Sequence, residues 1–151
     1  MENSKAIDAL NDLITKNYDA ERGYQEAAED VDDILLKSYF HQRARNRYDF
    51  GHDLKDEIRT LGGKPEKGTS VAGDLHRVWM DIKSSFTSQD EVAILNECKR
   101  GEEYAIEEYE EALKNNELPI SARTLISSQL NKIRSTVRGL ESKITRYEVV
   151  A

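Results

Sequence analysis

The sequence predicts an all-α protein, a four-helix bundle of up-down-down-up order with an extra short helix in the long crossover between helices 2 and 3. Apolar residues recur every three or four positions in four long segments, and no segment shows the alternation of a strand. Both prolines and four of the eight glycines lie between these segments. We expect residues 1–151 to form a single domain, because this length is enough for one apolar core.

The first two segments predict two antiparallel helices joined by a short turn. The first helix is expected to begin near Asn3 or Ser4, and Glu21 lies near the centre of its apolar face. The second follows the acidic residues 29–33 and ends at Gly62-Gly63, with Arg47 on its apolar face. The apolar positions are Ile7, Leu10, Ile14, Tyr24, Ala28 and Val31 in the first helix, and Leu36, Phe40, Leu54, Ile58 and Leu61 in the second.

Residues 62–87 predict a long crossover. It starts as a loop and continues from Ser70 as a helix of about 17 residues, long enough to travel a good part of the bundle. The second and third long helices can therefore run parallel, which is the order of bundles with one crossover connection. The apolar positions of the short helix are Val71, Leu75, Val78, Trp79, Ile82 and Phe86.

The third and fourth long helices are predicted from Ser88 and from Pro119 onward. Ser88 and Glu91 have the spacing of a capping box, which marks the start of the third helix. Glu102 lies inside the apolar stripe of that helix, where an ionised side chain needs a partner. The stripes consist of Leu95, Cys98, Ala105, Tyr109 and Ala112, and of Ile126, Leu130, Ile133, Val137, Leu140 and Ile144.

Charged residues are predicted to share one layer in the middle of the bundle. Glu21, Arg47 and Glu102 lie at similar depth and face the axis, whereas Arg134 has the same depth but points roughly 90° away. One interpretation is a buried ion-pair network that fixes the register of the helices, with Tyr24 and Tyr109 packed beside it. The other is a binding centre for a small anion or for one metal ion held by Glu21 and Glu102.

The residue types argue against di-iron chemistry in this layer. Such bundles use a Glu on each of two helices and a Glu-x-x-His pair on each of the other two. None of the three histidines follows a Glu by three residues, and the nearest match, Asp49 with His52, points away from the apolar face. An arginine cannot ligate a cation. We therefore expect no cofactor, and we expect Cys98 to be a buried, inert thiol.

Composition restricts the partners. The net charge is −7 with acidic and basic residues interleaved, which argues against nucleic acid. The first residues lack an apolar signal core and no segment has membrane-spanning length, so we expect a cytoplasmic protein without a membrane partner. Long exposed helix faces favour a homodimer. His76, Arg77 and Trp79 form either a patch for a protein partner or an anchor of the crossover helix.

Short motifs along nearly the whole chain carry a family resemblance: residues 10–14, 19–24, 61–65, 76–79 and 100–102. Their order resembles the bacterial ferritin-like four-helix-bundle proteins classed as domain of unknown function 2383. The resemblance implies the ferritin-like fold but no settled activity. Members often carry a His in the middle of the last helix, where Arg134 stands here. The preferred hypothesis is a non-enzymatic structural or interaction protein, with a stress-related role as one option; the alternative is a metal-binding or redox protein.

Overall fold

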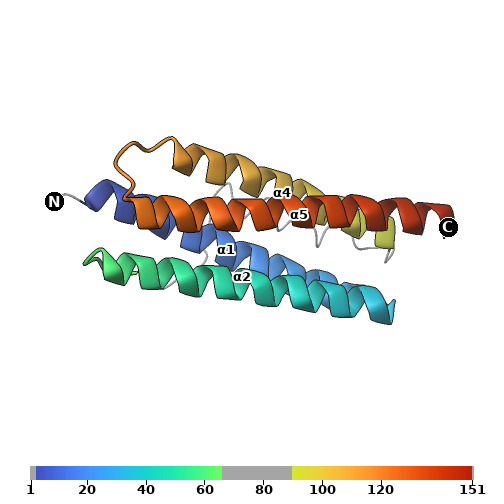
Figure 1. Ribbon diagram of the computed structural model, residues 1–151. Helices are drawn as coiled ribbons and strands as arrows, with labels where there is room; N and C mark the ends of the chain where they lie inside the picture. Colours follow the sequence, from blue (N-terminus) through green and yellow to red (C-terminus); the bar gives the residue numbers. More distant parts are fainter. Residues whose placement is uncertain (1–2, 66–89, 151) are drawn as a thin grey trace.

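The computed structural model describes residues 3–65 and 90–150, and within these ranges the chain forms four helices. They are α1 (Ser4–Asp30), α2 (Ile34–Thr60), α4 (Glu91–Leu113) and α5 (Ile120–Val150). In Figure 1, α1 and α2 form one antiparallel pair and α4 and α5 another, while α2 and α4 run in the same direction. The predicted up-down-down-up order is therefore confirmed. The short helix expected from Ser70 lies outside the described residues.

Local side-chain and glycine chemistry sets the helix ends. The Asp33 carboxylate accepts hydrogen bonds from the Leu35 and Leu36 amides, at 2.9 and 3.0 Å, and so starts α2. Gly62 ends α2 with a φ of 84°, and the Gly63 amide donates to the Ile58 carbonyl at 2.9 Å. This is the glycine-dependent helix end that the sequence predicts.

The start of α4 differs from the prediction. Its N-cap is Asp90 and not Ser88, because the Asp90 carboxylate accepts from the amides of Val92 and Ala93, at 3.0 and 3.3 Å. Serine and aspartate cap helices by the same hydrogen bonds, so two candidate caps two residues apart cannot be ranked from the pattern alone.

The apolar core consists of two clusters separated by a polar layer. One cluster lies near the turn between α1 and α2, and the other lies toward the opposite end of the bundle. Along α1, α2 and α4, Asn17, Arg47 and Glu102 stand between the two clusters, and Gln129 joins them from α5. All four polar side chains are buried. A polar layer thus crosses the core at mid-bundle, and burial on this scale requires that its groups be hydrogen-bonded.

Candidate functional site

A buried ion pair lies at the centre of the polar layer. Arg47 of α2 donates to Oε1 of Glu102 of α4, and the two side chains are 3% and 2% exposed. The other terminal nitrogen of Arg47 donates to the Asn17 side-chain oxygen at 2.5 Å. The hydroxyl of Tyr24 donates to Oε2 of Glu102 at 2.5 Å. Each carboxylate oxygen therefore has a protein donor, and the two charges compensate one another.

Hydrogen bonds extend this pair to the fourth helix. The Asn17 amide donates to the Leu13 carbonyl and to the Tyr109 hydroxyl, both at 2.8 Å. Tyr109 donates in turn to Oε1 of Gln129 at 2.7 Å, and the Gln129 amide donates to the Phe50 carbonyl at 3.1 Å. We call this chain of side chains the buried network; its members are Tyr24, Glu102, Arg47, Asn17, Tyr109 and Gln129. It connects all four described helices through directional bonds.

The surroundings keep the two tyrosines of the network protonated and its arginine charged. Burial and the nearby Glu102 carboxylate raise the pKa of Tyr24 well above its usual value, and burial raises the pKa of Tyr109 to about 12. Burial disfavours the charge on Arg47, but the Glu102 carboxylate favours it, and the net pKa of the guanidinium is raised. Both hydroxyls therefore stay protonated at neutral pH and can donate. Burial also raises the pKa of the Cys98 thiol well above its usual value, which makes it a poor nucleophile.

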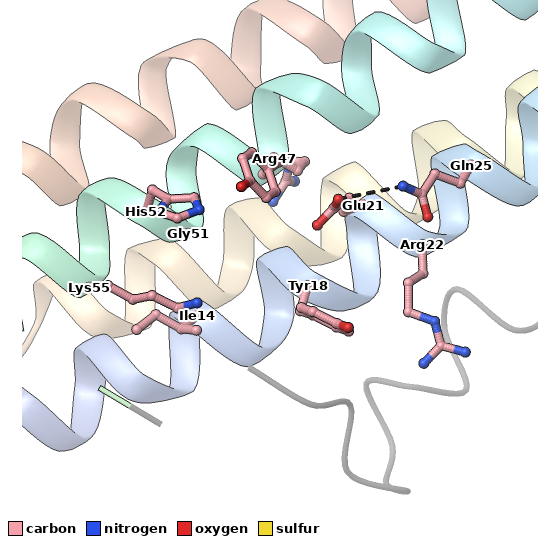
Figure 2. A pocket seen from close by; sticks show the side chains of 10 residues that line it. Ile14, Tyr18, Glu21, Arg22, Gln25, Arg47, Gly51, His52 and Lys55 are labelled. Atoms are coloured by element: carbon pink, nitrogen blue, oxygen red, sulfur yellow. Dashed lines mark hydrogen bonds between the residues drawn. The ribbon is translucent and has the colours of Figure 1, made fainter. Parts of the chain in front are cut away.

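The structure brings together four of the six predicted network residues, namely Arg47, Glu102, Tyr24 and Tyr109, and places the other two elsewhere. Glu21 is half-buried and lines a cavity between α1 and α2, where its carboxylate accepts from the Gln25 amide at 3.5 Å (Figure 2). The buried face of α1 includes Leu13, Asn17, Ala20 and Ala27, none of which the predicted stripe contained. These residues shift the centre of the face away from Glu21.

Arg134 also lies outside the buried network. It donates to Oε2 of Glu110 at 2.6 Å, and the two side chains are 42% and 49% exposed. The cause is the helical phase seen in the sequence: Arg134 follows the buried Ile133 by one residue, and so points about 100° away from it. Its placement in the central charged layer was wrong.

Two network residues, Asn17 and Gln129, were not predicted, because both are uncharged and the prediction rested on charged residues on the apolar faces. Both carry a recognisable signal. Asn17 follows Ile14 by three residues and Gln129 follows Ile126 by three, so each stands on the apolar stripe of its helix. The predicted patch of His76, Arg77 and Trp79 lies outside the described residues.

Two surface cavities reach Arg47 from different sides. The one between α1 and α2 has a volume of about 290 Å³ and is lined by Tyr18, Glu21, His52 and Lys55 among others (Figure 2). The one between α2 and α5 has a volume of about 280 Å³ and also reaches Glu102. Across residues 3–65 and 90–150, no three His, Cys, Asp or Glu side chains are grouped so that they could hold a metal ion.

The fold defines the class of protein, a ferritin-like four-helix bundle. A solved structure similar to it is the bacterioferritin-related protein from Bacteroides fragilis, described as a dodecameric thioferritin, with a TM-score of 0.67 and 19% identity over 95% of this chain and 88% of that chain. The chain belongs to the family described as Domain of unknown function (DUF2383), whose model matches residues 5–115. The family resemblance predicted from the sequence is thus confirmed. No curated protein sequence gives a significant match.

None of the described helices combines the length and the apolar character needed to span a membrane.

Proposed function

We propose that this chain is a non-enzymatic ferritin-like protein that acts through its structure and its contacts with other proteins. The observation that carries this proposal is the state of Glu102, because both of its oxygens accept from protein donors and its charge is balanced by Arg47. A carboxylate occupied in this way is a poor ligand, since a metal ion would have to displace a buried guanidinium. The buried network then serves to hold four helices in one register.

The alternative is a metal-binding or redox protein that uses Glu21 and Glu102 as ligands for one divalent ion. Its support is the similarity to a protein described as a thioferritin. Against it, Glu21 bonds with Gln25 in the cavity between α1 and α2, while Glu102 bonds with Arg47 and Tyr24 in the core. We therefore give the structural role the greater weight and propose no cofactor.

The proposal includes self-association in the cytoplasm. The bacterioferritin-related protein is described as a dodecamer, and two-fold dimers are the commonest symmetric assemblies of soluble proteins. We propose a homodimer as the smallest assembled form of this chain, with a further protein partner as its biological target and stress physiology as its setting. Light scattering coupled to gel filtration tests the dimer, which a purely monomeric mass would contradict.

Elemental analysis tests the proposal against its alternative. The protein is produced in medium containing iron, manganese and zinc, purified without chelator and measured beside the variants Glu21→Gln, Glu102→Gln and Glu110→Gln. We expect well under one metal ion per chain in all four proteins. The opposite result is about one ion per chain in the wild type, lost in both Glu21→Gln and Glu102→Gln but retained in Glu110→Gln. Glu21 is half-buried, so its variant stays informative if Glu102→Gln fails to fold.

A further inference from the structure

The cavity between α2 and α5 has the dimensions of a small binding site. It is lined from α2 by Tyr39, Arg43 and Asn46, and from α5 by Lys132 and Ser135, and it ends at the buried Arg47–Glu102 pair. Its volume of about 280 Å³ is near the lower limit for pockets that hold organic ligands, about 300 Å³. The cavity therefore suits an ion or a very small molecule.

The charges that line this cavity are mainly positive. Arg43, Arg47 and Lys132 contribute three cations, whereas Glu102 is the single carboxylate and is already paired with Arg47. Arg43 and Lys132 form no ion pair with any residue in the described part of the chain. This positive cavity occurs in a chain whose net charge is −7. Two cations that line one cavity and pair with no carboxylate of the described residues favour the binding of an anion there.

The Arg43 guanidinium is held in place by an aromatic ring, and one of its N–H donors has no acceptor among the described residues. Its guanidinium lies over the Tyr39 ring, 5.1 Å from the ring centroid, which restricts its orientation. The Nε–H of Arg43 is buried and lacks a hydrogen-bond partner among the described residues. A buried donor left without an acceptor has lost its hydration without compensation, so an acceptor at this place is favourable. Across the cavity, Lys132 Nζ lies 5.9 Å from the centroid of the Phe50 ring.

We propose that this cavity binds a small oxyanion of the phosphate class. A guanidinium presents two parallel donors to such an anion, and an ammonium adds a point charge. Arg43 and Lys132 are the recognition residues, and the Asn46 amide and the Ser135 hydroxyl lie at the same cavity as neutral donors. The buried network keeps all its bonds on binding, because only groups outside it are used. This inference does not depend on the proposed structural role.

Calorimetric titration with inorganic phosphate tests the proposal, with chloride used to hold the ionic strength constant. We expect saturable heat for the wild type and binding at least about tenfold weaker in Arg43→Gln and in Lys132→Gln. Arg138→Gln is the matched control, because Arg138 is an exposed cation of α5 that does not line the cavity. A second titration with glycerol phosphate distinguishes a free ion from an esterified phosphate group as the ligand.

Two results would overturn the proposal: no saturable heat in the wild type, or an equal loss of binding in Arg138→Gln. The second would assign the effect to overall charge. A thermal shift alone is not decisive, because phosphate stabilises many proteins by exclusion from their surface. Circular dichroism of each variant separates loss of binding from loss of fold.

Discussion

Two arginine–glutamate pairs, both involving α4, show how depth changes the role of the same chemistry. Arg47 pairs with Glu102 in the core, where the side chains are 3% and 2% exposed. Arg134 pairs with Glu110 at the surface, where they are 42% and 49% exposed. Water solvates the exposed pair whether or not it forms, and such pairs are worth about 0–1 kcal/mol. The buried pair lacks this alternative, so the protein itself must satisfy every charge.

The partners of the two pairs reflect this difference. Around the buried pair, Tyr24 and Asn17 provide further hydrogen bonds, and Tyr109 and Gln129 continue the chain to α5. A helix shifted by one turn would leave a buried charge or amide without its partner. The buried network therefore contributes more to the specificity of the helix register than to net stability. Apolar residues of similar volume in its place can give the same free energy of unfolding.

The largest effect is expected from Arg47→Met, which keeps much of the side-chain volume but leaves the Glu102 carboxylate buried without its cation. We expect the free energy of unfolding to fall by about 3–5 kcal/mol, measured by urea denaturation at neutral pH. An unchanged unfolding midpoint would mean that Arg47 is not part of the core.

The control removes both charges. Arg47→Met combined with Glu102→Leu leaves no stranded ion, and we expect it to recover most of the lost stability. If the double variant is as unstable as Arg47→Met alone, the loss comes from packing and not from the unpaired charge.

A smaller change in the free energy of unfolding is expected at high pH, where the tyrosine hydroxyls of the buried network ionise. Tyr109 ionises at about 12 in the folded protein, against a usual value of 10.0, so the unfolded chain releases its proton first. The contribution of Tyr109 to the free energy of unfolding is fully present below pH 10. It falls as the pH rises toward 12, by up to about 1.4 kcal/mol per pH unit. Urea denaturation at stepped pH measures the slope. Tyr109→Phe should make it shallower, and Tyr104→Phe, a change at the surface, is the control.

The sequence was sufficient for the four long helices and their order because each of these elements has a local cause. Periodicity located the four long helices, Gly62 and Gly63 marked the end of α2, and the length of the crossover allowed α2 and α4 to run parallel. The start of α4 was misplaced because Ser88 and Asp90 compete as caps and local chemistry favours neither. Local rules determine the elements well and their ends less well.

The candidate site was only partly predictable, for a geometric reason. Arg47, Glu102, Tyr24 and Tyr109 lie near the centres of their stripes, so a modest error in phase does not move them out of the core. Glu21 was predicted near the centre of its stripe but lies at the edge of the buried face that α1 has in the structure, where the same error decides between the core and the surface cavity. Asn17 and Gln129 are uncharged; a search for every polar residue on an apolar stripe would have found both.

The smallest effect is expected from Arg134→Met, which removes the arginine of the exposed Arg134–Glu110 pair. Glu110 then stays in water, so no desolvated charge is stranded, and the free energy of unfolding should change by less than about 1 kcal/mol. Salt sharpens the test, because raising the ionic strength screens exposed charges far more than buried ones. The small difference between wild type and Arg134→Met should shrink in 1 M salt, whereas the cost of Arg47→Met should persist. If both differences responded equally to salt, depth would not be what distinguishes the two pairs.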